Sequence, residues 1–165
     1  TTLTPRGHAD LIEFPAPGAF ELVAHPTRDE VLWTVACGQD GGGFARVAWA
    51  ADAPVAEPAP RWLDDRHFWV LGFQPDGRAL VLAAGHIELQ DAGVPVASHP
   101  ASGHHGALVG SHLLIGHDDG YHVLDATSLA PQGELDPDGG VFTLSGDRVV
   151  IMRKDSLRIA TTSAD

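Results

Sequence analysis

The feature of this sequence that most constrains its fold is a segment that occurs three times along the chain. Each copy begins with a turn glycine, continues with an apolar triplet, and then has a short turn and a second, alternating strand pattern. The three copies are Gly77–Asp91, Gly110–Asp125 and Gly146–Ile159. Their first glycines lie 33 and 36 residues apart, which is typical of arrays in which each repeat forms one small structural unit.

The positions that align between the copies are apolar. The first strands contain the triplets Leu80–Leu82, Leu113–Ile115 and Val149–Ile151, and the second strands contain Ile87 and Leu89, Tyr121 and Val123, and Leu157 and Ile159. A diverged fourth copy precedes them, with His25–Arg28 in place of the glycine turn and Val31–Trp33 in place of the triplet. The 165 residues give about 41 for each of four copies, which is the length of a four-stranded unit.

Short apolar runs separated by Gly, Pro and Asp indicate strands along the whole chain, and no segment shows sustained helical spacing. The turn Pro75–Gly77 is typical of this punctuation, because proline fixes φ and glycine accepts a positive φ. The strands expected from the pattern are Phe20–Ala24, Val31–Ala36, Phe44–Trp49, Phe68–Phe73, Ala79–Ala84, Ile87–Asp91, Val94–Ser98, Ala107–Val109, His112–Gly116, Tyr121–Asp125, Gly133–Leu135, Val141–Leu144, Arg148–Arg153 and Ser156–Ala160. Many short antiparallel strands predict a sandwich, barrel or propeller.

Two segments carry a resemblance to a known family. Phe73–Leu80 resembles the strand–turn–strand opening of a WD-repeat blade, and Gly116–Asp125 resembles its second hairpin. The resemblance extends from about Phe20 to Ile159, although Gln90-Asp91 and Leu124-Asp125 stand where the family has Trp-Asp. It implies an all-β, β-propeller-like single domain over residues 1–165, with about four repeats of four-stranded antiparallel blades.

The two ends of the chain suggest how such a ring closes. The last copy ends at its third strand, and Ala9–Phe14 is an apolar segment that precedes the first blade. In propellers resembling this one, a strand from one terminus completes the blade begun by the other. We therefore expect the N-terminal strand to pair beside Ser156–Ala160 and close the last blade, which would remove two unpaired edges. Closure within one chain, closure by two chains, and membership of a larger ring all stay open.

Composition excludes several functional classes. The chain has 22 acidic and 10 basic residues and a formal net charge of −12, which argues against binding of nucleic acid. Its one cysteine, Cys37, excludes a disulfide scaffold, and no apolar run approaches the roughly 20 residues of a membrane span. No signal-peptide pattern follows Thr1. We expect a soluble, acidic, cytoplasmic protein with the Arg-, Ala- and Gly-rich composition of a bacterial genome.

Ten histidines equal all cationic side chains in number, and six of them gather with acidic residues in one part of the chain. The group is His99, His104, His105, His112, His117 and His122, with Asp118 and Asp119. In the third blade, His104 and His105 would lie in the loop that leads into the first strand. His117, Asp118 and Asp119 would lie in the second hairpin turn, at the same end of the ring. Imidazole and carboxylate groups there suit zinc or another divalent ion. The WD resemblance implies instead that Gly103-His104 and Asp118 or Asp119 form a structural brace, with no cofactor, and solvated loops are a third interpretation.

Two further candidates lie outside this group. Asp64 and Asp65 follow Trp62, the tryptophan most expected to be exposed to a ligand, and paired carboxylates hold cations or transfer protons. His112 and Asp125 should face each other across a hairpin, where the carboxylate would raise the pKa of the imidazole.

These observations support three functional hypotheses. The favoured one is a non-enzymatic binding or scaffold module that recognises a protein, or a small ligand, through the loop-lined face of a propeller. A basic partner fits the acidic chain, and the expected binding residues are Trp62, Asp64, Asp65, His104, His105, Asp118 and Asp119. The second is a metal-binding protein or metal-dependent enzyme that uses His104, His105, His117 and Asp118. The third is a half-ring completed by homodimerisation; no nucleic-acid or membrane partner is expected.

Overall fold

The computed structural model describes residues 19–36, 42–50, 53–63, 66–101, 105–117, 120–135, 141–145, 148–152 and 156–161. These residues form antiparallel strands joined by turns, and no helix occurs among them. The described part of the chain therefore contains no helix of the length and apolar character needed to cross a membrane. The all-β fold class expected from the repeats is confirmed.

The strands form four antiparallel sheets, and strands that are consecutive in the chain are neighbours in each sheet. The first and second sheets consist of β1 (Ala19–Ala24), β2 (Glu30–Ala36), β3 (Gly42–Ala50) and β4 (Ala53–Pro58), and of β5 (His67–Phe73), β6 (Ala79–Ala83), β7 (His86–Asp91) and β8 (Val94–Pro100). The third sheet consists of β9 (His105–Val109), β10 (His112–His117), β11 (Gly120–Asp125) and β12 (Pro131–Leu135). The last sheet consists of β13 (Val141–Ser145), β14 (Arg148–Met152) and β15 (Leu157–Thr161).

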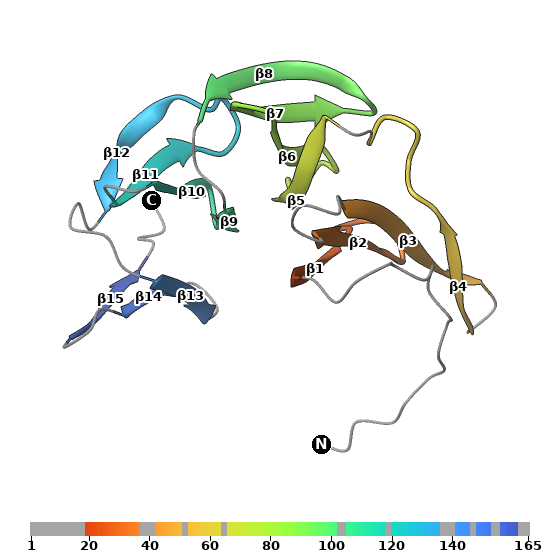
Figure 1. The fold of residues 1–165 in the computed structure, drawn as a ribbon, viewed down its shortest axis with the longest axis horizontal. Helices are drawn as coiled ribbons and strands as arrows, with labels where there is room; N and C mark the ends of the chain where they lie inside the picture. The colour runs from red at the N-terminus through yellow and green to blue at the C-terminus, as the bar shows by residue number, and fades with distance from the viewer. Residues whose placement is uncertain are drawn as a thin grey trace.

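The four sheets stand around an arc, with the first strand of each sheet nearest the centre and the last strand outermost (Figure 1). Three of the sheets have the expected four strands, and the last has three among the described residues, in agreement with a last copy that ends at its third strand. The strand expected over Ala9–Phe14 lies outside the described residues. The described strands of the first and the last sheet lie at the two ends of an open arc (Figure 1).

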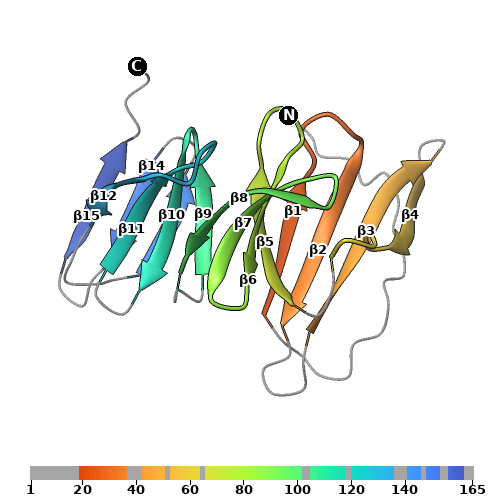
Figure 2. The same ribbon diagram turned by 90° about the horizontal axis from the view of Figure 1, so that it is seen from above.

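The inner strands of the four sheets lie roughly along one common axis and alternate in direction, so their turns collect at two opposite ends (Figure 2). We call one the first-hairpin end, because it holds the turns between the first and second strands, β1–β2, β5–β6 and β9–β10. The other is the second-hairpin end, where β6 turns into β7 and where β5 and β9 begin. These two ends are the surfaces on which loop residues can meet.

Alternating side chains on each strand pack against the sheets on either side, and three apolar junctions result. In the first junction, between the first two sheets, Leu32 packs with Val70, Phe73 and Val81. The second junction, between the second and third sheets, contains Leu80, Leu82, Ile87, Leu89, Leu113, Ile115 and Leu124. The third junction joins Leu114 and Tyr121 to Val149 and Ile151 of the last sheet. The aligned triplets of the sequence repeats thus supply the core of every sheet that contains them.

Fourteen of the fifteen strands lie where the apolar runs predict them, and β4 is the exception. Its six residues include Pro54 and Pro58, which break the pattern expected of a strand. The outermost strands β8 and β12 also carry prolines, Pro95, Pro100 and Pro131. An edge strand tolerates proline because its outward N–H groups have no partner in the sheet. The prolines also prevent further strands from pairing with these edges.

Candidate functional site

A hollow of about 400 Å³ opens at the first-hairpin end. It is lined by residues of three turns, in the second and third sheets: Gln74, Pro75, Asp76, Arg78, Gly110, Ser111 and Thr127. The β5–β6 turn contributes one wall and the β9–β10 turn contributes the other, with Thr127 from the turn that precedes β12. The hollow therefore forms only where two neighbouring sheets are packed side by side.

Gln74 connects the two sheets at the base of this hollow. The residue is buried, and its Nε2 donates a hydrogen bond to the carbonyl oxygen of Ala126 at 2.6 Å. The backbone N–H of Ala126 in turn donates to the carbonyl oxygen of Ser111 at 2.9 Å. A buried amide that lost its partner would be costly, so these bonds fix the β5–β6 turn against the third sheet.

The charged residues of the hollow are Asp76 and Arg78. The Arg78 Nε lies 2.8 Å from Asp76 Oδ2, and the Arg78 backbone N–H donates to Asp76 Oδ1 at 3.1 Å. That backbone hydrogen bond, followed by the guanidinium, lowers the pKa of the Asp76 carboxyl. The group is therefore ionised at neutral pH, and its half-exposed oxygens can accept hydrogen bonds from a ligand.

The rim near Thr127 is fixed by Asp125. Its Oδ1 accepts hydrogen bonds from the backbone N–H groups of Thr127 and Ser128, at 3.0 and 2.7 Å, and from the Ser128 hydroxyl at 2.8 Å. These bonds lower the pKa of the Asp125 carboxyl, with Ser128 as the main cause. The predicted pairing of His112 with Asp125 is confirmed by the strand register. The His112 ring, however, places Nδ1 2.6 Å from Oε1 of Gln132, so the carboxylate chiefly orders its own turn.

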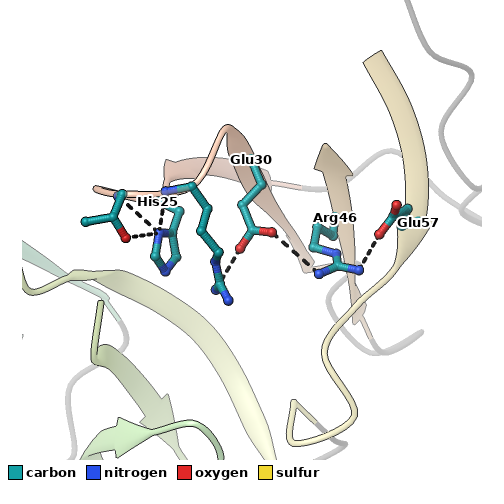
Figure 3. Close-up of polar contacts among 6 residues, drawn as sticks. His25, Glu30, Arg46 and Glu57 are labelled. Atoms are coloured by element: carbon teal, nitrogen blue, oxygen red, sulfur yellow. Dashed lines mark hydrogen bonds and ion pairs between the residues drawn. The ribbon is translucent and has the colours of Figure 1, made fainter. Parts of the chain in front are cut away.

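His25 extends this surface onto the first sheet (Figure 3). Its Nδ1 accepts the backbone N–H groups of Thr27 and Arg28, at 3.2 and 3.1 Å, so this nitrogen carries no proton. The ring packs on Phe73 with centroids 4.7 Å apart, and a Cβ added at Gly77 would lie 3.3 Å from it. Burial, and then the nearby Arg28 charge, lower the pKa of the imidazole. The β1–β2 and β5–β6 turns are therefore in direct contact.

A chain of ion pairs lies beside this turn (Figure 3). The buried Glu30 carboxylate is 2.7 Å from Arg28 Nη2 and 3.5 Å from Arg46 Nη1. The other end of the Arg46 guanidinium pairs with Glu57 on the neighbouring strand. Since Glu30 lies on the same side of β2 as Leu32, these charges belong to the first junction. They compensate one another, which indicates a structural role.

Of the residues predicted to bind a ligand or a metal, the structure places His105 and His117 at the second-hairpin end. The register pairs Gly116 with His105, so the strand ends at His105 and His117 do lie at the same end. The His117 ring stacks on His122 with centroids 4.0 Å apart, and His122 Nε2 is 3.9 Å from Glu134 Oε1. The remaining candidates, namely Asp64, Asp65, His104, Asp118 and Asp119, lie outside the described residues, as does the side chain of His105.

Trp62 is half-buried and packs against the first junction. Its ring stands edge-on to His67 with centroids 6.3 Å apart. A Cβ added at Gly93 would lie 2.6 Å from the Trp62 Cβ, so only glycine fits at that turn. The structure thus places Trp62, a residue of the loop before β5, against the β7–β8 turn.

A cluster of polar side chains that no sequence motif indicates surrounds Glu88 on β7. The Glu88 Oε1 atom is 2.6 Å from His86 Nε2. The Oε2 atom is 3.6 Å from Nε2 of the buried His67 and accepts a hydrogen bond from Gln90 Nε2. His86 Nδ1 also faces an acceptor, the Ala84 carbonyl oxygen at 3.0 Å. The hydrogen bond to Glu88 is the main cause that raises the pKa of His86, and the bond to Ala84 adds to it. Alternation with Ile87 and Leu89 could have indicated that His86, Glu88 and Gln90 share a face.

Neither end presents a metal centre in the part of the chain that the structure describes. No group of three or more His, Cys, Asp or Glu side chains among the described residues is arranged to hold an ion.

Comparison of the sequence with protein-family models finds no match, and comparison with curated proteins finds no significant relative.

Proposed function

We propose that the chain is a non-enzymatic binding module of the β-propeller type, similar to WD-repeat proteins, and that it holds a segment of a partner protein at its first-hairpin end. The observation that carries this proposal is the hollow of about 400 Å³ between the second and third sheets. The placement of the sheets around an arc, with their first strands toward the centre, supports a propeller-type arrangement (Figure 1). The repeat of sheets along the chain supports it further.

The lining of the hollow suits an extended peptide. Ser111 and Thr127 are exposed and supply hydroxyl groups that both donate and accept hydrogen bonds. The ionised Asp76 carboxylate can pair with a lysine or arginine of the peptide through a charge-assisted hydrogen bond. The net charge of −12 also attracts basic segments from a distance. We therefore assign the hollow to a basic peptide segment.

The same lining favours binding over catalysis. The residues that line the hollow include no histidine or cysteine, and its carboxylate and guanidinium are engaged with each other at 2.8 Å. Nucleophilic catalysis needs a hydroxyl or thiol next to a base. The one carboxylate of the lining, Asp76, is a weak base because its pKa is lowered, so the Ser111 and Thr127 hydroxyl groups have no strong base in the lining and the hollow is suited to recognition.

A displayed library of short random peptides tests the proposal. We expect peptides selected on the intact protein to be rich in lysine and arginine, and to bind at least tenfold more weakly to Ser111→Trp and Thr127→Trp, which fill the hollow. Both side chains are exposed, so the variants should keep their circular dichroism and unfolding midpoint. Ser98→Trp, exposed on β8 away from the hollow, is the matched control and should bind as the parent does.

Two results would overturn the proposal. One is a selection that enriches no peptide over a selection without protein. The other is a set of peptides whose affinity is the same for the parent and for both hollow-filling variants, because such peptides bind elsewhere.

A further inference from the structure

The two nitrogens of the His25 ring have different surroundings. Nδ1 accepts the backbone N–H groups of Thr27 and Arg28, at 3.2 and 3.1 Å, so the proton of the neutral ring lies on Nε2. Nε2 points away from this turn (Figure 3) and makes no hydrogen bond within the described part of the chain. The ring thus presents an N–H donor whose position is fixed by the turn and by packing on Phe73.

Gly77 leaves the space beside this donor open. A Cβ added at Gly77 would lie 3.3 Å from Cε1 and 3.4 Å from Nε2 of the His25 ring, so a side chain there would cover this edge of the imidazole. Gly77 also has a φ of 91°, which favours glycine at this position of the turn. Because glycine has no side chain, the main chain of a ligand can approach closely at such a position.

The donor lies next to the hollow. Gly77 stands between Asp76 and Arg78, which both line the hollow. The β5–β6 turn therefore has the hollow on its side toward the third sheet and the His25 ring on its side toward the first. An extended peptide advances about 3.3 Å per residue, so a peptide whose basic side chain pairs with Asp76 brings a neighbouring peptide group over Gly77.

We propose that the peptide site continues across the β5–β6 turn, and that His25 Nε2–H donates a hydrogen bond to a main-chain carbonyl oxygen of the bound basic peptide. The inference rests on the proposed function, and it gives the two side chains different roles. Asp76 selects a cationic side chain, whereas His25 holds the main chain of a nearby residue of any type. A carbonyl oxygen suits this donor because every residue of a peptide carries one.

This contact makes peptide binding depend on pH. A protonated His25 carries a proton on Nδ1, which can then no longer accept the turn N–H groups, and the imidazolium repels a basic peptide. The other charged groups around the ring belong to its own turn and to the β5–β6 turn: Arg28, Asp29, Glu30, Asp76 and Arg78. Burial lowers the pKa of His25, so peptide affinity should fall at pH values below about 6.5.

Two histidine variants of the intact protein test the contact, with selected peptides whose binding Ser111→Trp weakens as the probes. His25→Asn keeps an acceptor for the turn N–H groups but loses the Nε2–H donor. Calorimetry at pH 7.5 should show about three- to tenfold lower affinity for this variant, as expected for one hydrogen bond. His99→Asn is the matched control, because His99 is also half-buried but lies on β8, and it should bind as the parent does.

The pH dependence provides a second comparison of the same proteins. Between pH 7.5 and 5.0, the parent and His99→Asn should both lose at least threefold more affinity than His25→Asn. Nitrogen-15 NMR of the parent provides a measurement that needs no variant to fold. The His25 ring should show the Nε2–H tautomer, and its Nε2 signal should shift when the peptide is added.

The choice of a main-chain acceptor is tested on the peptide side. The loss of affinity caused by His25→Asn should persist when each peptide residue other than the basic one is replaced in turn by Ala. A loss that disappears with one peptide side chain overturns main-chain recognition.

Failure of this inference is distinct from failure of the peptide site itself. Peptides that respond to Ser111→Trp but bind His25→Asn and the parent equally overturn the His25 contact alone, as does an Nε2 signal that stays unchanged when the peptide is saturating. A selection that yields no peptide sensitive to Ser111→Trp overturns both the peptide site and the contact.

Discussion

The second sheet packs on a neighbour through both of its faces, and the two junctions differ in chemistry. Toward the third sheet it presents the apolar side chains of Leu80, Leu82, Ile87 and Leu89. Toward the first sheet it presents Val70 and Val81, but the same face of β7 also carries His86 and Glu88. The second junction is thus built from apolar groups, whereas the first combines an apolar centre with ionisable groups.

The first sheet contributes to this difference from its own side. Glu30 and Arg46 lie on the face that meets the second sheet, and the face directed away from the arc carries Leu22, Val31 and Val47. The contact of the first sheet with the rest of the molecule should therefore depend on pH and salt, and the second junction should not.

The largest effect is expected in the second junction. Replacing the buried Leu82 by Ala should lower the free energy of unfolding by about 2–5 kcal/mol, because the lost methyl groups leave a cavity between two sheets. Urea unfolding followed by circular dichroism measures the change. Val96→Ala, exposed on β8, is the control and should cost less than about 0.5 kcal/mol. Equal losses for the two variants would contradict the packing described for this junction.

An intermediate effect is expected at the ion pairs of the first junction. Glu30→Gln keeps the shape of the buried side chain but removes the charge between Arg28 and Arg46, and should cost about 1–3 kcal/mol. Raising the salt concentration should destabilise the parent more than this variant, which urea titrations at low and high salt compare. Arg28→Ala alters an exposed partner and should cost less than about 1 kcal/mol. A variant as stable as the parent would show that the first junction does not depend on the Glu30 charge.

The smallest effects concern two histidines that should respond to pH in opposite directions. The pKa of His25 is lowered, so its stabilisation is complete above its unfolded pKa of about 6.5 and declines as the pH falls below that value. The pKa of His86 is raised, so its stabilisation is complete below about 6.5 and declines as the pH rises through its folded pKa. Each change should stay below about 1 kcal/mol, because solvent reaches both rings.

Unfolding of the parent, His25→Asn and His86→Gln across this pH range separates the two contributions. In His25→Asn, the amide oxygen can still accept hydrogen bonds from the turn N–H groups. This variant should therefore lose only the decline in stability at acidic pH. His86→Gln should lose only the decline on the alkaline side. If either variant followed the pH profile of the parent, the corresponding ring would not contribute as described.

The repeats made most of the fold predictable. The aligned triplet Leu80–Leu82 and the alternation of Ile87 with Leu89 fix both the strands and the faces that they bury, because a strand has a period of two residues. The strand β4 was missed because Pro54 and Pro58 are compatible with a strand only at the edge of a sheet, and edge position is not evident before the sheet is known.

The site was less predictable than the fold. The hollow depends on Gln74 and Ser111, which are polar residues of ordinary turns in two different sheets, and only the packing of those sheets brings them together. His105 and His117 were correctly expected at one end, since the hairpin register follows from the apolar pattern. The contacts of His67 with Glu88 span two strands separated by β6, and no spacing in the sequence signals them.

All eleven pairings between the described strands join consecutive strands. Such connections close only short loops, so each sheet can form early with little loss of loop entropy. Cooperation between sheets then rests on the junctions alone, as in other proteins built from repeated units. The apolar second junction should make the second and third sheets one folding unit, whereas the first sheet should be the part that detaches first when its charges are altered.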